Sequence, residues 1–241
     1  MNTLHNFIFN VYPYICLAVF FMGSLARFDR DQYTWKSDSS QLLRKAQLRW
    51  GSNLFHGGIL FLFFGHLFGQ LTPHGLYEIF VTASQKQLIA VVAGGVAGGL
   101  CFIGLTMLLH RRLFDPRIRL TSHRTDIAIL IILWVQLVIG LSTLPASLHH
   151  VSDPQTMLRL AEYLQGIVLM QPNAALVAGI EWHFQAHMLL GMTIFLLFPF
   201  SRLVHVWSGF ATVAYLFRPR QLVRSRRLNV PAGHNQPGRT A

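Results

Sequence analysis

Four histidines lie in apolar segments of the sequence that are long enough to cross a membrane. His56 and His66 fall in segment 53–71, which contains no charged residue, and His187 and His205 fall in segment 185–207. An imidazole in hydrocarbon needs a hydrogen bond, a pore or a metal, because an unpaired polar group there costs on the order of several kcal/mol. These four side chains are therefore the first candidates for chemistry.

The elements that must position these histidines are five apolar segments, which predict an all-α polytopic membrane protein with five transmembrane helices in a bundle. They comprise residues 7–26, 53–71, 88–109, 127–144 and 185–207. About 20 residues of helix span the hydrocarbon core of a bilayer. Of the 20 Lys and Arg residues, 18 flank these segments on one side, and only Lys86 and Arg159 lie on the other. The positive-inside rule then predicts the N-terminus outside and the C-terminus inside.

The composition excludes several other classes of protein. With 52% hydrophobic and 12% charged residues the chain is too apolar for a soluble domain. Its net charge of +11 follows from topology and predicts no nucleic-acid site, because no soluble module mixes basic and aromatic residues. Cys16 and Cys101 lie in apolar segments without a C-x-x-C motif, which argues against a protein-held iron–sulfur cluster, a disulfide framework and covalently attached haem. We expect one membrane domain over 1–226 and a polar cytoplasmic tail over 227–241.

The predicted topology places the histidines at two depths. His66 and His187 fall near the outer side, and His56 and His205 near the inner side. Antiparallel packing of the second and fifth apolar segments therefore predicts two histidine pairs. On straight helices the roughly 15 Å between His56 and His66 must then match the roughly 27 Å between His187 and His205. Helix tilt, a bend at Pro199 and the reach of the ligands are the ways in which this mismatch could be absorbed.

Haem iron is the metal that best suits two imidazoles in an apolar bundle, because the porphyrin supplies four nitrogens and buries an apolar disc. Zinc would need a third or fourth protein ligand, and the two segments that hold the histidines, 53–71 and 185–207, contain no Cys, Asp or Glu. Glycines beside the histidines would let a flat macrocycle approach the backbone: Gly57, Gly58, Gly65, Gly69 and Gly191. His183 is an alternative ligand to His187, and a hydrogen bond to a neighbouring helix is the alternative role for any single histidine.

Cations near the predicted pairs are further candidates. Arg202 precedes His205 by one turn, and Arg111 and Arg112 end the third apolar segment on the same inner side, so these arginines are candidates for haem propionates. Interfacial snorkelling is their alternative role. Lys86 lies almost alone on the outer side and is a candidate for hydrogen-bonding a quinol oxygen or a propionate. The other histidines are expected to have ordinary polar roles at membrane edges or in loops: His5, His74, His110, His123, His149, His150 and His234.

Two structural features are also predicted. Asp153 and Pro154 are typical of an N-cap and a first helical residue, and they predict a short amphipathic helix on the outer surface. The third apolar segment contains a stripe of small residues that predicts close helix contact, formed by Gly94, Gly95, Gly98 and Gly99.

Six motifs, in order along the chain to about Arg226, carry a resemblance to a known family. They are VYPYI, RxDxxQYTWxxxSSQ, SNLFHxGIL, FxGHxFGxLTPH, RRLFxPRxR and LGMTxFLLFPFSRLxHxW. Together they resemble the gamma subunit of respiratory nitrate reductase, a membrane cytochrome b. The resemblance implies five transmembrane helices and two haem b groups.

The resemblance also implies roles for individual residues. His66 and His187 would ligate the outer haem iron, and His56 and His205 the inner one. Lys86 would belong, beside His66, to the site of quinol oxidation. The same resemblance implies that Arg112 and Arg202 lie near propionates of the inner haem.

The implied function is oxidation of menaquinol or ubiquinol near the periplasmic side. Electrons would pass through the two haems to the iron–sulfur (beta) subunit and on to the molybdenum (alpha) subunit, which reduces nitrate. The protein would then be a multi-pass protein of the bacterial inner (cytoplasmic) membrane, surrounded by lipid. Two alternatives remain open: a diheme b-type anchor of another quinol-linked reductase, heterodisulfide-reductase-like or sulfite-linked, and a non-redox transporter or assembly anchor that uses histidines as a proton path.

Overall fold

A computed structural model describes residues 2–30 and 45–207 of the chain. The predicted tail and the predicted domain boundary after residue 226 lie outside the described residues. Met1–His205 form one compact unit, and of the second unit, Val206–Ala241, only Val206 and Trp207 are described. The described residues form helices and connecting turns without a β-strand, as the sequence predicts.

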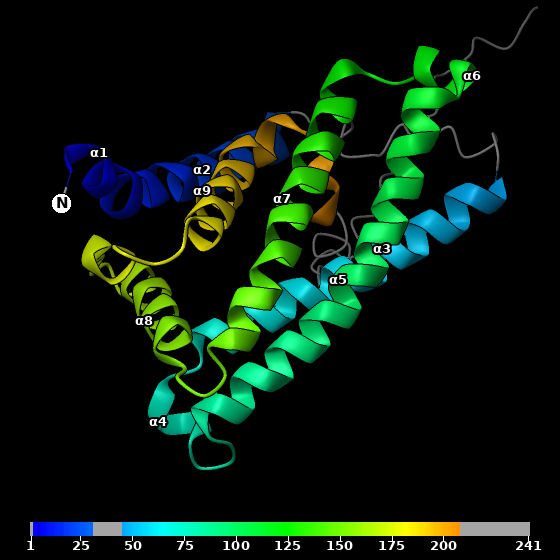
Figure 1. The fold of residues 1–241 in the computed structure, drawn as a ribbon. Coiled ribbons are helices and arrows are strands. Elements are labelled where there is room, and N and C mark those ends of the chain that lie inside the picture. Colours follow the sequence, from blue (N-terminus) through cyan, green and yellow to red (C-terminus); the bar gives the residue numbers. More distant parts are fainter. Residues whose placement is uncertain (1, 31–44, 208–241) are drawn as a thin grey trace, which may run out of the picture. The chain divides into compact units, whose positions relative to one another are not determined.

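The helices are labelled in Figure 1. In chain order they are α1 (Thr3–Asn6), η1 (Phe7–Val11), α2 (Tyr12–Arg30), α3 (Lys45–Leu71), α4 (His74–Tyr77), α5 (Ala83–Phe114), α6 (Pro116–Leu120), α7 (Arg124–His149), α8 (Gln155–Val168), η3 (Ala174–Leu176), α9 (Trp182–Leu197), η4 (Phe198–Phe200) and η5 (Arg202–Val204). Among the described residues, five stretches are helical, long and apolar enough to cross a membrane: Thr3–Arg30, Ala46–Leu71, Ala83–Phe114, Arg124–His149 and Trp182–Phe200. The five predicted spans are confirmed.

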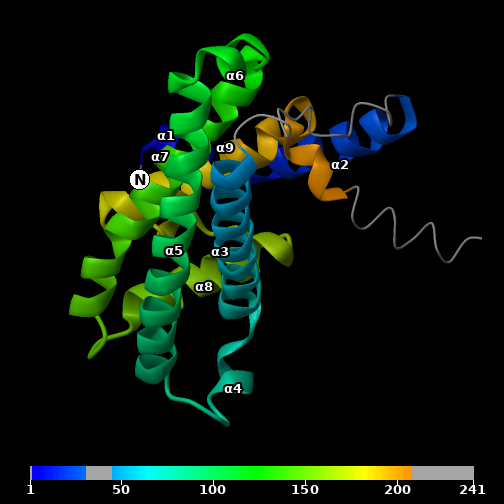
Figure 2. The ribbon, with the colours of Figure 1, turned by 90° about the vertical axis from the view of Figure 1, so that its right-hand side faces the viewer.

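The long helices pack in an order that differs from the chain order. Helix α3 packs against α5, α5 against α7, α7 against α9, and α9 against α2 (Figures 1 and 2). The predicted direct packing of the second span on the fifth is wrong in this respect, because α3 and α9 are not among the extensively packed pairs of the described residues. Their histidine side chains meet between them instead.

Close contact between α3 and α5 depends on glycine. A Cβ at Gly58 would lie 2.7 Å from the carbonyl oxygen of Ala97, and Gly104 approaches the backbone of α3 as closely. The predicted glycine stripe of α5 contributes less than expected. Gly98 does face a leucine side chain of α7, 2.7 Å from an added Cβ, whereas Gly94 faces open space.

The fifth predicted span is not one continuous helix. Helix α9 ends at Leu197, and Ser201 adopts an extended conformation with φ −122° and ψ 174°. Pro199 lacks the N–H that a continuing helix requires. Arg27 on α2 donates to the carbonyl oxygens of Pro199 (2.7 Å) and Ser201 (3.0 Å), and the Ser201 hydroxyl accepts from the N–H of Leu203 (3.2 Å). Backbone groups at the break therefore have hydrogen-bond partners outside a regular helix. The break also sets the position of the residues that follow it.

The predicted amphipathic helix is α8. Its buried side chains share one face: Leu160, Ala161, Tyr163 and Ile167. Tyr163 donates its hydroxyl to the carbonyl oxygen of Phe9 at 2.7 Å and so joins α8 to η1. The prediction that Asp153 caps this helix is wrong, because the N-cap residue is Pro154 and no side chain caps the first turn.

Candidate functional site

The four histidines of the apolar segments form two pairs. The rings of His66 on α3 and His187 on α9 have centroids 6.1 Å apart. Those of His56 on α3 and His205, which follows η5, are 6.2 Å apart. The structure thus brings together the side chains that the sequence pairs. The alternative candidate His183 instead places its ring 4.6 Å from that of Trp182.

The separation of the paired rings suits a metal between them. Two metal–nitrogen bonds of about 2.0–2.1 Å each, with the distance from each nitrogen to its ring centre, place such rings about 6 Å apart. Among the described residues, no three His, Cys, Asp or Glu side chains gather as metal ligands. A site made of two imidazoles therefore fits a metal that brings its own in-plane ligands, as haem iron does.

Hydrogen bonds to the backbone fix the tautomer of three of the rings. The Nδ1 atoms lie near carbonyl oxygens as follows: His56 near Ser52 at 2.8 Å, His66 near Leu62 at 2.7 Å, and His205 near Arg202 at 2.6 Å. A carbonyl only accepts, so Nδ1 carries the hydrogen and the lone pair lies on Nε2. Histidines that bind metals are held in this way.

The fourth ring, His187, lies against α7. Gln136 donates its amide N–H to the carbonyl oxygen of His187 at 3.0 Å, and the same amide nitrogen lies 3.4 Å from Nε2 of the ring. Nδ1 is buried and makes no hydrogen bond within the described part of the chain. A Cβ at Gly140 would lie 2.7 Å from Cε1 of His187, so glycine is needed there. The ring of His187 is thus closely packed and its Nδ1 atom has no hydrogen-bond partner among the described residues. Both features fit a ring that binds a ligand or a metal.

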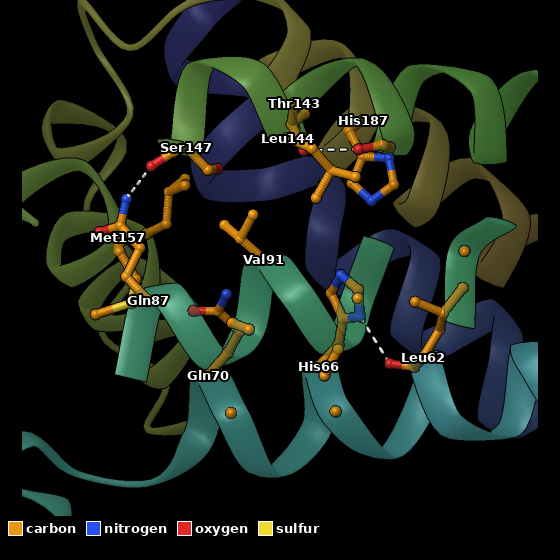
Figure 3. A pocket seen from close by; sticks show the side chains of 18 of the residues that line it. Leu62, His66, Gln70, Gln87, Val91, Thr143, Leu144, Ser147, Met157 and His187 are labelled. Carbon is orange, nitrogen blue, oxygen red and sulfur yellow. Dashed lines mark hydrogen bonds between the residues drawn. The ribbon is translucent and has the colours of Figure 1, made fainter. Parts of the chain in front are cut away.

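A cavity of about 420 Å³ opens beside the outer pair. Figure 3 shows His66 and His187 facing one another at one end, and Gln87 with Ser147 at the other. Residues of α3, α5, α7, α8 and α9 line it, and most of them are apolar. At Gly65 and Gly69, which also line it, an added Cβ would meet nothing within 4 Å. The volume is typical of a site for a small organic ligand.

The cavity contains a few polar groups among its apolar walls. The Oε1 atoms of Gln70 and Gln87 are buried and accept no hydrogen bond within the described residues. The amide nitrogen of Gln87 donates to the carbonyl oxygen of Ser147 at 2.6 Å. Sequence reasoning missed both glutamines. The available signals were that Gln70 follows His66 by one helical turn and that Gln87 adjoins Lys86.

Lys86 lines the same cavity as His66, as the sequence predicts for a residue at that depth. Its Nζ atom lies 3.5 Å from the centroid of the Tyr77 ring. Burial raises the pKa of Tyr77, so the phenol remains neutral beneath the ammonium group. A cation–π contact of this kind holds an ammonium group without neutralising it.

The inner candidates Arg112 and Arg202 share one carboxylate. Nη1 of Arg112 lies 3.6 Å from Oδ2 of Asp126, and Nε of Arg202 lies 3.0 Å from Oδ1. Arg112 also donates to the Ser122 hydroxyl at 3.1 Å. Arg111, the residue before it, is buried. The guanidinium groups of Arg112 and Arg202 therefore gather at the carboxylate of Asp126. Sequence reasoning missed Asp126, which lies one residue before the predicted fourth span.

One more pair of titratable groups borders the cavity. His150, which lines the cavity, places Nε2 2.7 Å from Oε1 of Glu181. The backbone N–H of Glu181 and then the His150 ring hold the pKa of this carboxyl below its usual range. Sequence reasoning gave His150 an ordinary polar role and did not single out Glu181. The two residues are far apart in the sequence, so no spacing indicates their contact.

Comparison with known proteins gives a consistent result over nearly the whole chain. The family described as nitrate reductase gamma subunit matches residues 5–226. The chain is similar to the respiratory nitrate reductase 2 gamma chain of Escherichia coli (strain K12), with 50% identity over 94% of this chain and 100% of that one. It is 48% identical to the respiratory nitrate reductase 1 gamma chain of the same organism, over 94% and 100%. Identity to the nitrate reductase gamma chain of Bacillus subtilis (strain 168) is 36%, over 91% and 97%.

Proposed function

The chain belongs to the nitrate reductase gamma subunit family, and from this premise we propose that it oxidises quinol in the membrane and delivers the electrons to a nitrate reductase on the inner side. The observation that carries the proposal is the pair of histidine pairs, with ring centroids 6.1 and 6.2 Å apart, and the cavity that joins the outer pair to Lys86. Similarity to nitrate reductase chains favours this over an anchor of another reductase.

In this proposal His66 and His187 hold the outer haem b, and His56 and His205 hold the inner one. Haem, when bound, supplies a one-electron redox centre whose potential depends on its ligands, hydrogen bonds and burial. The backbone carbonyls at Nδ1 of His56, His66 and His205 orient these ligands. At the inner site the guanidinium groups of Arg112 and Arg202, which meet at Asp126, are the proposed partners of a haem propionate.

The outer cavity is the proposed quinol site. Its apolar walls suit the ring of menaquinol or ubiquinol, and the buried Oε1 atoms of Gln70 and Gln87 can accept hydrogen bonds from hydroxyl groups. Lys86 donates to a quinol oxygen and stabilises negative charge that develops there as the proton leaves. The side chains of the cavity thus bind the head group, orient it toward His66 and exclude bulk water.

The protein lies in the bacterial inner membrane with its N-terminus outside, so that the cavity faces the periplasmic side. Electrons leave at the inner side toward the iron–sulfur (beta) subunit, which feeds the molybdenum (alpha) subunit. Protons are released outside, so each turnover separates charge across the membrane.

The test is reduction of the purified complex by quinol, followed by haem absorbance. We expect the wild-type complex to be reduced, and Lys86→Met to slow the reaction about 10- to 100-fold, because a hydrogen bond from a charged group contributes about 1.5–3 kcal/mol. Arg159→Gln is the matched control, since Arg159 lies on the same side and does not line the cavity. A complex that quinol does not reduce, or full activity of Lys86→Met, would contradict the proposal.

A further inference from the structure

We propose that His150 and Glu181 form a proton-release dyad at the outer end of the cavity, in which His150 takes a proton from a quinol hydroxyl and Glu181 passes it to water. The inference rests on the proposed function, because it assigns residues to the proton half of quinol oxidation. Electrons and protons leave a quinol separately. The haems of the proposed function accept the electrons, so a different group must accept the protons.

The position of the dyad supports this role. Figure 3 shows Ser147 at the end of the cavity opposite the His66–His187 pair. His150 lines the same cavity and is the C-cap residue of α7, three residues after Ser147. Glu181 is the N-cap residue of α9. The side chains of His150 and Glu181 are 38% and 36% exposed. The dyad therefore links a mostly apolar cavity to solvent, because one member lines the cavity and both are partly exposed.

Hydrogen bonding fixes the direction in which a proton can move. A carboxylate only accepts, so at 2.7 Å the Nε2–H of His150 donates to Oε1 of Glu181. The Nδ1 atom of His150 then carries the lone pair. Since the pKa of Glu181 is held low, the carboxylate is ionised near neutral pH and stabilises the imidazolium that forms when Nδ1 is protonated. This is the relation between a histidine base and its orienting carboxylate.

The proton moves from the quinol to water in two transfers. The O–H bond of a quinol hydroxyl breaks, its proton forms a bond to Nδ1 of His150, and the electron pair of the O–H bond stays on the quinol oxygen. Nε2 of His150 gives its proton through Glu181 to water, which leaves the Nδ1–H tautomer. A half-turn of the ring then brings Nδ1–H to Glu181 and the vacant Nε2 to the cavity, so that the dyad can take a second proton. Oxidation of one quinol removes two electrons, taken one at a time by the redox centres of the proposed function, and releases two protons, so the dyad acts twice.

Other titratable groups around the dyad are less suited to this task. Lys86 in the same cavity is an ammonium group, which has no lone pair to accept a proton. His66 and His187 line the far end and are the proposed metal ligands. His183 on α9 contributes only a weak favourable interaction with the Glu181 carboxylate. The positive charge of Lys86 also favours movement of protons away from the cavity, toward the carboxylate.

The experiment compares four variants of the whole complex: His150→Gln and Glu181→Gln, with His149→Gln and Glu162→Gln as matched controls at exposed positions. Quinol-driven turnover is measured over about two pH units on either side of 6.5, the ordinary pKa of histidine. Binding of a redox-inert quinol analogue and the haem spectrum are measured in parallel. These two readouts report whether the cavity and the haem sites are intact.

We expect His150→Gln to lower kcat at least about tenfold, since general bases contribute about 10²- to 10⁴-fold, while binding of the analogue changes little. Glu181→Gln removes the charge that stabilises the imidazolium, so His150 becomes a weaker base. The plateau rate then falls and the acid limb of the pH profile moves to lower pH, a shift that a purely structural role would not produce. Added imidazole should partly restore the activity of His150→Ala.

The outcomes separate the dyad from the proposed function. Wild-type reduction by quinol with unchanged rates and pH profiles in His150→Gln and Glu181→Gln would overturn the dyad and leave the proposed function standing. Absence of quinol-driven reduction in the wild-type complex would overturn the proposed function itself. Loss of analogue binding in both dyad variants would assign them to the structure of the cavity and would also overturn the proton role.

Discussion

The rings of His56 and His205 lie 6.2 Å apart because the chain breaks after α9. On one continuous helix His187 and His205 would be roughly 27 Å apart, whereas His56 and His66 on α3 are separated by roughly 15 Å. The end of α9 at Leu197 and the extended residue that follows η4 change the direction of the chain between the two histidines. Both pairs can therefore form at once, which a straight fifth helix would not allow.

Replacement of one histidine in each pair should remove one haem each. We expect His66→Gln and His56→Gln to lose chiefly the outer and the inner haem respectively, because each variant removes one of the two imidazoles that would hold that haem. A pyridine haemochrome assay of the purified complex measures the haem that remains. His183→Gln is the control and should retain both. Full haem content in either pair variant would refute the pairing as a ligand set.

Gly140→Ala should disturb the outer histidine pair alone. The new Cβ would lie 2.7 Å from Cε1 of His187, so the ring must move toward His66 or rotate. We expect a changed spectrum and potential for the outer haem and an unchanged inner haem, measured by redox titration followed optically. At Gly99, also within a membrane helix, an added Cβ meets nothing within 4 Å, so Gly99→Ala is the matched control. Equal behaviour of the two variants would contradict this role of Gly140.

Asp126→Asn should destabilise the inner side of the bundle. The carboxylate is 9% exposed and pairs with both Arg112 and Arg202, whose side chains are 11% and 16% exposed, so its loss leaves two largely covered cations without their shared anion. Removing one partner of a buried ion pair costs about 3–5 kcal/mol. Thermal unfolding of the complex should shift to lower temperature, and the inner haem potential should rise because added positive charge favours the reduced form. Asp153→Asn, at an exposed position, should change neither.

The sequence predicts the membrane spans and the histidine pairs well because both follow from strong physical constraints. A bilayer demands long apolar helices, and an imidazole in such a helix must have a partner. The five spans were therefore found with end errors of up to seven residues, and the rings of His56, His66, His187 and His205 lie in the pairs that were predicted. The distribution of basic residues gave the depth of each histidine in the membrane, and the depths showed which histidines could pair.

Features that depend on side chains meeting across the fold were not predicted. Asp126 contacts arginines of two other elements, and His150 contacts Glu181, yet neither contact has a periodic signal. The break after α9 was expected only as a bend, because the hydrogen bonds that Arg27 supplies come from a distant helix. Local residue types do not reveal such tertiary partners.

The His150–Glu181 contact should contribute stability that depends on pH in a defined direction. The pKa of Glu181 is lowered in the folded protein, so the contribution is present above the ordinary glutamate pKa of about 4.3 and is lost as the pH falls through the lower, folded value. The difference in thermal midpoint between wild type and Glu181→Gln should thus be small but measurable at neutral pH and should vanish in acid. Glu162→Gln should show no such difference, and a difference that grew in acid would contradict the assignment.

Reporter fusions should place the C-terminus inside the cell and the loop between α7 and α8 outside. The reason is the distribution of basic residues, which leaves only Lys86 and Arg159 on the side of the cavity. Alkaline phosphatase, which is active only outside the cytoplasm, should be active when inserted after Asp153 and inactive when fused at the C-terminus, and a fluorescent protein at the C-terminus should be bright. The opposite pattern would turn the cavity with Lys86 and His150 toward the cytoplasm. Protons from quinol would then be released inside and the electrons would leave on the outer side, so quinol oxidation at this site would separate charge in the opposite direction.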